Sequence, residues 1–186
     1  MSNIKNTVQQ YDQVIERCRE IFTKKTADYG TAWRVLRTIS IVDQIYIKAQ
    51  RIRTIQEKGE QKIGDDIASE YIGIINYAII GNIQLGLPTN APEELDVAHT
   101  IALYNAQCQA AKTLMLDKNH DYGEAWRSMS GESFADLILM KLQRIRQILL
   151  NKGQTLISEG IDANYYDILN YAVFALILLH EKEANQ

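Results

Sequence analysis

Residues 25–34 read KTADYGTAWR, and residues 118–127 read KNHDYGEAWR. The similarity continues beyond this phrase, because residues 28–55 and 121–148 are identical at 15 of 28 positions at a constant offset of 93 residues. After one inserted residue the offset becomes 94, and the NYA of residues 76–78 recurs at residues 170–172. Repetition over this length is typical of an internal duplication, so the chain consists of two homologous units.

A segment of different composition separates the two units. GLPTNAPEE, residues 86–94, holds both prolines of the chain and begins with a glycine that can end a helix. This composition predicts a linker. We therefore assign the first unit to residues 1–87, the linker to residues 88–95 and the second unit to residues 96–186.

The head of each unit shows the spacing of an amphipathic helix. Apolar side chains recur there at steps of three and four residues: Ile4, Val8, Tyr11, Val14, Cys18 and Ile21, and then Val97, Ile101, Tyr104, Cys108, Ala111 and Met115. The DYG triplet that follows predicts a turn, because glycine adopts conformations that a side chain penalises. A short helical turn comes next, and we expect its tryptophan, Trp33 or Trp126, to plug the core.

The rest of each unit is predicted to form two further helices. Ser40-x-x-Asp43 and Ser133-x-x-Asp136 have the spacing of a capping box, which would open a helix that ends at the following KG pair. The last helices are expected at about residues 65–85 and 158–180. No segment of useful length alternates with period two, so the sequence predicts an all-α protein whose units pack about a pseudo-twofold axis, as in a fused dimer.

Composition and charge exclude several classes of protein. Hydrophobic residues make up 46% of the 186 residues, which is enough for a core, and the net charge of −3 gives no basic field for DNA. The longest apolar run, residues 171–179, is far shorter than the roughly 20 residues of a membrane span, and no export signal is recognisable. We therefore expect a cytoplasmic protein that neither enters a membrane nor binds DNA directly. Cys18 and Cys108 are expected to be buried thiols.

The last helix differs between the units in its acidic residues. The second unit carries Glu159, Asp162 and Asp167, whereas the equivalent residues of the first unit are Asp65, Ala68 and Gly73. Carboxylates on one face of a helix can bind Mg²⁺, which prefers oxygen ligands and substrate phosphates. The structural alternative is that these acids are solvated, interact with the helix dipole, or pair with Lys141 or Arg144.

Two cations stand at the same spacing in both units. Lys141 and Arg144 match Lys48 and Arg51, and they flank the apolar stripe of the middle helix. They are candidates for phosphate contacts, and a shared structural role in salt bridges is the alternative. Arg53 and Arg146 are expected to face solvent. The histidines have no partner pattern for a zinc site, and His120 has no nucleophile nearby in sequence.

The order DYGxAW, KxxRI and D-x-x-NYA resembles a family of bacterial and phage proteins described as nucleotide-modification-associated domains, whose genes lie near those for DNA base modification. The resemblance covers both units, and the first unit departs from the pattern at Gly73. In the second unit it rests on Asp121, Tyr122, Gly123, Trp126, Lys141, Arg144, Glu159, Asp167, Asn170 and Tyr171.

The layout is also distantly similar to the all-α nucleoside triphosphate pyrophosphohydrolases of the MazG type. Those enzymes hold Mg²⁺ with an ExxE motif on one helix and an ExxD motif on the next. Glu159-x-x-Asp162 fits the second motif, whereas the helix over residues 134–150 offers only Asp136 for the first.

These observations lead to the hypothesis of a Mg²⁺-dependent nucleotide-associated protein that either binds a (deoxy)nucleoside triphosphate or hydrolyses it to release pyrophosphate. Glu159, Asp162 and Asp167 would bind the metal, Lys141 and Arg144 the phosphates. The pocket for base and sugar would be lined by Asp121, Tyr122, Trp126, Asn170 and Tyr171. We thus expect the site in the second unit, with the first copy of DYGxAW kept for structure. The alternative is a non-catalytic helical adaptor, and assembly into a homo-oligomer is open in either case.

Overall fold

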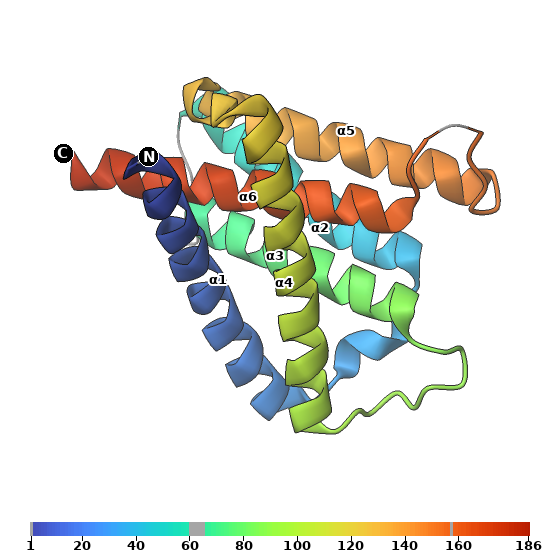
Figure 1. Ribbon diagram of the computed structural model, residues 1–186. Helices are drawn as coiled ribbons and strands as arrows, with labels where there is room; N and C mark the ends of the chain where they lie inside the picture. The colour runs from blue at the N-terminus through green and yellow to red at the C-terminus, as the bar shows by residue number, and fades with distance from the viewer. Residues whose placement is uncertain (1, 60–65, 157) are drawn as a thin grey trace.

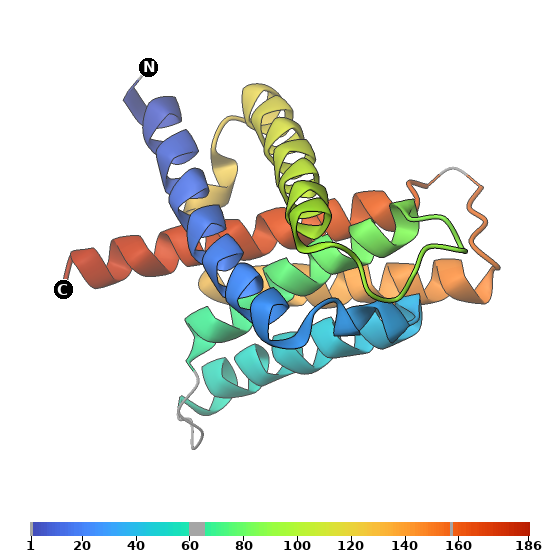
Figure 2. The same ribbon diagram turned by 90° about the horizontal axis from the view of Figure 1, so that it is seen from below.

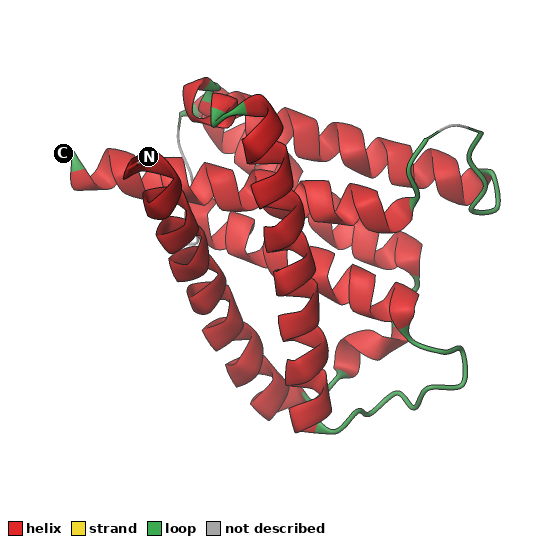
Figure 3. Ribbon diagram, viewed as in Figure 1, coloured by secondary structure: helices red, strands yellow, loops and turns green. Residues whose placement is uncertain are grey.

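The computed structural model describes residues 2–59, 66–156 and 158–186, and it confirms the all-α prediction, because no strand occurs in the described part. Figures 1 and 3 show long helices joined by short turns and loops. The elements are α1 (Ser2–Tyr29), η1 (Ala32–Val35), α2 (Thr38–Lys58), α3 (Ile67–Gly86), α4 (Val97–Tyr122), η2 (Ala125–Ser128), α5 (Gly131–Leu150) and α6 (Ile161–Ala184).

The two units are interleaved rather than set side by side. Helices α2, α3, α5 and α6 form a bundle in which α3 packs on α6 and α2 packs on α5, and α1 and α4 lie across α3 and α6 (Figures 1 and 2). The matching helices α1 and α4, α2 and α5, and α3 and α6 thus take equivalent places about a pseudo-twofold axis. Because α3 and α6 are covered from several sides, their apolar residues form the centre of a shared core.

Two buried tyrosines, one from each unit, form hydrogen bonds with the other unit. The hydroxyl of Tyr11 in α1 donates to the side-chain oxygen of Asn170 in α6 at 2.7 Å. Tyr104 in α4 makes the equivalent bond to Asn76 in α3, also at 2.7 Å. Each asparagine also donates, Asn76 to the carbonyl of Cys18 and Asn170 to that of Ala111, both at 3.1 Å. These amides therefore lie within the hydrogen-bonded core. The two cysteines are free and buried, as predicted.

The capping-box prediction is wrong. Helix α2 begins after Arg37 and α5 after Ser130, so the predicted cap serines lie inside the helices. The two aspartates instead form ion pairs across the pseudo-twofold axis: Asp43 with Arg146 at 3.0 Å and Asp136 with Arg53 at 3.7 Å. Arg53 is exposed, as predicted, whereas Arg146 is partly buried, and each of them also bridges the two units through these contacts.

The two DYG phrases end α1 and α4 and build the turns that follow. Gly30 and Gly123 have φ angles of 59° and 62°, in the left-handed region that glycine favours. The linker packs back on the first turn, where the hydroxyl of Thr31 donates to the carbonyl of Glu93 at 2.6 Å. The last helices begin at Ile67 and Ile161, slightly later than predicted, and Asp65 lies outside the described residues. None of the described helices has the length and apolar character needed to cross a membrane.

Candidate functional site

The three acids that the sequence singled out do not gather in the structure. Because α6 begins only at Ile161, Glu159 lies in the preceding loop, and Asp162 is exposed in the first turn of the helix. Asp167 is buried five residues further along the helix. Within the described ranges, no three His, Cys, Asp or Glu side chains form a group that could hold a metal ion. In this arrangement the three acids do not fit a Mg²⁺ site.

Asp167 is instead held between two lysines. One carboxylate oxygen accepts from Lys118 at 2.6 Å and the other from Lys141 at 2.7 Å. Lys141 is buried and Lys118 is about half exposed. Burial alone would lower the pKa of Lys118, but the hydrogen bond and the charge of Asp167 outweigh it, so the pKa is raised above its ordinary value. Lys141, predicted to contact phosphate, is thus already neutralised by a carboxylate.

The other predicted site residues of the second unit are dispersed. Asp121 and Tyr122 are exposed, and Asp121 contacts His120 at 3.1 Å. Trp126 is buried and stacks on Phe174, with ring centroids 4.2 Å apart and an interplanar angle of 6°. Tyr171 is half-buried, and burial and the nearby Asp167 charge raise the pKa of its hydroxyl. With Asn170 in the core, these residues do not line a common pocket in the second unit.

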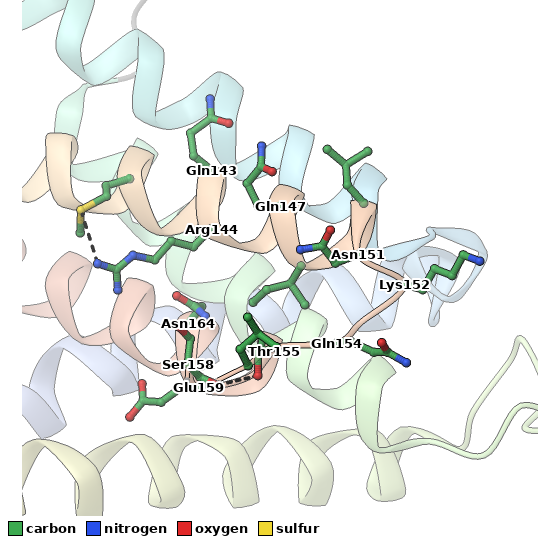
Figure 4. A pocket seen from close by; sticks show the side chains of 14 residues that line it. Gln143, Arg144, Gln147, Asn151, Lys152, Gln154, Thr155, Ser158, Glu159 and Asn164 are labelled. Atoms are coloured by element: carbon green, nitrogen blue, oxygen red, sulfur yellow. Dashed lines mark hydrogen bonds between the residues drawn. The ribbon is translucent and has the colours of Figure 1, made fainter.

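Arg144 lies in a different cavity of the second unit. This α5 cavity, of about 1170 Å³, lies between the C-terminal half of α5 and the segment that leads into α6. Figure 4 shows that Arg144 comes from α5, whereas Glu159 comes from the loop that leads into α6 and Asn164 from the first turn of α6. In the first unit the counterpart of Arg144 is Arg51, which forms an ion pair with Glu70. The second unit has Asn164 in place of Glu70. Arg144 and Glu159 are therefore the predicted site residues that share a cavity.

The motif residues of the first unit do line a pocket. This first-unit pocket has a volume of about 740 Å³, within the usual range for small-molecule sites. Its wall includes the first copies of the motif: Lys25, Tyr29, Trp33, Lys48, Asn76 and Tyr77. The prediction placed the site in the second unit, but there the equivalent motif residues are paired, stacked or dispersed, as described above.

Two residues in the lining of this pocket are smaller than their counterparts in the second unit. Gly73 stands where the second unit has Asp167, and the end of the Lys48 side chain packs against it, because a Cβ built on Gly73 would lie 2.8 Å from Cε of Lys48. Ile80 stands where the second unit has Phe174, so the ring that stacks on Trp126 has no counterpart at this position of the first unit.

The pocket is rich in cations and aromatic rings. Arg17, Lys25 and Lys48 line it, and Glu70 is the carboxylate among its lining residues. Glu70 forms an ion pair with Lys48 at 3.5 Å and also pairs with Arg51, so it neutralises part of this charge. Lys25 is exposed at the pocket edge and has no ion pair with a described residue. The indole nitrogen of Trp33 is buried without a hydrogen-bond partner among the described residues.

Fold and pocket together define a duplicated all-α protein with a basic, aromatic-lined pocket that the first copy of its repeated motif builds. The chain belongs to the family described as nucleotide modification associated domain 1, whose model matches residues 25–85 and 118–179, more than half of the chain. The two matched segments run from the lysine of each repeated phrase to the last helix of its unit. Neither the curated proteins nor the solved structures contain a match to this chain.

Proposed function

We propose that the first unit binds a nucleotide in the first-unit pocket. The observation that carries this proposal is the lining itself, which combines three cations with aromatic side chains in one concave surface. A nucleotide presents a flat aromatic base at one end and negatively charged phosphate at the other. The pocket offers a surface for each, and the family name is consistent with a ligand of this class.

The aromatic wall provides the contact for a base. Trp33 is half-buried and faces the pocket together with Tyr29 and Tyr77. Stacking of a base on an aromatic side chain contributes about 1–3 kcal/mol and tolerates every base, because each has a π face. We therefore place the base at Trp33.

The cations provide the contact for phosphate. Arg17 and Lys25 come from α1 and Lys48 from α2, so two helices supply positive charge to the same pocket. Charge-assisted hydrogen bonds of this kind are roughly twice as strong as neutral ones, and a partly enclosed site screens them less than bulk water does. Lys48 leans over Gly73, and Glu70 keeps its amine on that side of the pocket.

The proposal is for binding, and it includes no metal-dependent step. Mg²⁺-dependent release of pyrophosphate, the finer hypothesis from the distant resemblance, would need carboxylates that converge on the phosphates. The carboxylate in the lining of the first-unit pocket is Glu70, which is already paired with two cations. We therefore test hydrolysis beside binding by measuring pyrophosphate release with and without Mg²⁺.

Calorimetric titration with the four common deoxynucleoside triphosphates and their monophosphates tests the proposal. We expect binding of at least one nucleotide, and we expect Lys25→Ala to weaken it about tenfold, the loss of roughly 1.4 kcal/mol that one charge-assisted contact supplies. Lys24→Ala is the matched control, because Lys24 is the preceding residue of α1, is exposed and pairs with Glu20 outside the pocket. If no nucleotide binds, or if both variants bind equally well, the proposal is refuted and the adaptor hypothesis is preferred.

A further inference from the structure

The second unit contains, in its own side chains, groups that resemble the two ends of a nucleotide. We infer that Asp167 and Phe174 occupy, in the second unit, the places that the anionic group and the base of the ligand take in the first unit. The anion subsite of the first unit would then lie between Lys25 and Lys48 above Gly73, and the ring subsite on Trp33 beside Ile80. This inference rests on the proposed function and adds to it where each end of the ligand binds.

The anion subsite follows from the correspondence of the lysines. Lys118 and Lys141, which hold Asp167, align with Lys25 and Lys48 of the first unit, and all four belong to matching helices. Each oxygen of the Asp167 carboxylate accepts from a different lysine, at 2.6 and 2.7 Å. Two oxygens of a phosphate group can bridge two lysines in the same way.

The carboxylate of Asp167 has no counterpart in the first unit. Residue 73 is glycine, and the end of the Lys48 side chain lies against it, because a Cβ there would lie 3.1 Å from Nζ of Lys48. The first unit therefore keeps both lysines but lacks the carboxylate that bridges them in the second, since its Glu70 pairs with Lys48 and Arg51 instead. Arg17 adds positive charge that the second unit does not have, since Ala110 takes its position.

The ring subsite follows from the tryptophans. In the second unit the face of Trp126 is covered by Phe174 in a parallel stack, with an angle of 6° between the rings. Ile80 replaces that ring in the first unit, and Trp33 lines the pocket there. A nucleobase is a flat aromatic system, so it can adopt the offset-stacked geometry that aromatic pairs prefer. The two subsites lie seven residues apart on α3, two turns along the same face of the helix.

In the second unit, the protein's own side chains accordingly take the places that the ligand takes in the first unit. Its phenylalanine and aspartate hold the tryptophan and lysines in place without a ligand, which explains why both units keep the same motif. The first unit has exchanged these two side chains for smaller ones and needs an external molecule to provide the same contacts. The ligand class is a molecule with one aromatic ring system and one anionic group, as in a nucleotide.

Gly73→Asp is the decisive variant. The aspartate would meet two lysines in the arrangement that the second unit already tolerates, and only the flexible end of Lys48 has to move. We expect Gly73→Asp to fold and to weaken binding of dATP, or of the tightest nucleotide of the titration, by at least tenfold. Gly73→Ala is the control, because it adds the Cβ without the carboxylate, and we expect it to weaken binding less. Equal binding by Gly73→Asp and the wild type overturns the inference, and so does an equal loss in both variants.

The reverse variant creates a site in the second unit. Asp167→Gly leaves Lys118 and Lys141 without their carboxylate, so inorganic pyrophosphate should raise the melting temperature of this variant more than that of the wild type. Equal shifts count against the inference. If this variant fails to fold, the binding measurement on Gly73→Asp still tests the assignment of the anion subsite. The two proposals fail in different ways: the absence of nucleotide binding by the wild type refutes the proposed function, whereas binding that persists in Gly73→Asp refutes the subsite assignment alone.

Discussion

Replacement of Asp167 by asparagine tests whether this residue is a structural partner of lysines rather than a metal ligand. The side chain of Lys141 is only 9% exposed, so the variant leaves a buried ammonium with a neutral amide in place of its counterion. Removal of one partner of a buried ion pair typically costs about 3–5 kcal/mol. The amide still offers one oxygen, so we expect the lower end, about 3 kcal/mol. For a chain of this size that corresponds to a fall in melting temperature of about 6–12 °C.

The expected losses of stability differ between the two lysines that pair with Asp167, because the lysines differ in exposure. Lys118 is 46% exposed, and an ion pair with such a group contributes only about 0–1 kcal/mol because water screens it. Lys118→Ala should therefore cost less than about 1 kcal/mol, well below Asp167→Asn. The double variant Asp167→Leu with Lys141→Met removes both buried charges and should recover most of the stability lost in Asp167→Asn.

The assay is urea denaturation followed by far-ultraviolet circular dichroism, at neutral pH and without divalent ions. The slope of the transition should stay constant while the midpoint moves, because the surface exposed on unfolding does not change. A loss smaller than about 1 kcal/mol in Asp167→Asn would refute the reasoning, since it would mean that the carboxylate is not needed by Lys141. A marked gain of wild-type stability on addition of Mg²⁺ would count against it too.

Three further outcomes are expected. Tyr104→Phe leaves the amide oxygen of its buried partner without a donor and should cost about 1–3 kcal/mol in the same assay; a loss below about 0.5 kcal/mol contradicts the bridging role of the tyrosine. Gly30→Ala and Gly123→Ala each place a side chain at positive φ, and Gly123 has ψ −156° in a region that is essentially restricted to glycine, so each variant should cost about 1–3 kcal/mol in the same assay; at Gly30 the new Cβ would also meet Glu94, and a loss below about 0.5 kcal/mol in either variant contradicts the need for glycine at these turns. Burial raises the pKa of the Cys108 thiol to about 12, so the thiol should react with a disulfide reagent at pH 8 only after unfolding. Because unfolded thiols ionise near pH 9, the same shift predicts a loss of stability as the pH rises from about 9 towards 12.

The helices and the duplication could be predicted because they depend on local patterns. Steps of three and four residues place apolar side chains on one face of a helix whatever the helix packs against, and the turns at Gly30 and Gly123 need glycine for reasons internal to the backbone. The capping boxes could not be predicted correctly, because a Ser-x-x-Asp spacing is equally compatible with an aspartate that pairs with an arginine of the other unit. That arginine is about a hundred residues away, and only the packing of α2 on α5 brings it near.

The candidate site was harder to predict because a missing side chain leaves no positive signal in a sequence. Gly73 was interpreted as the loss of a metal ligand, when in the structure it lines a pocket and lies against the end of Lys48. Asp167 was interpreted as a ligand, when it is neutralised by two lysines that lie 26 and 49 residues away in the chain. A pairwise comparison of the repeats with attention to side-chain volume would have shown that Gly73 and Ile80 are both smaller than their counterparts in the second unit.

The sequence by itself determined that this protein is all-α and duplicated, with glycine turns and tryptophans at equivalent places, because periodicity and repetition are properties of neighbouring residues. Only the tertiary structure decided which copy of the motif is occupied by its own side chains and which is open. The physical reason is that a cavity and an ion pair both depend on what the opposing helix brings into the same space. For Lys25 and Lys48 that is Gly73 together with Glu70, which pairs with Lys48, whereas for Lys118 and Lys141 it is the carboxylate of Asp167, which pairs with both.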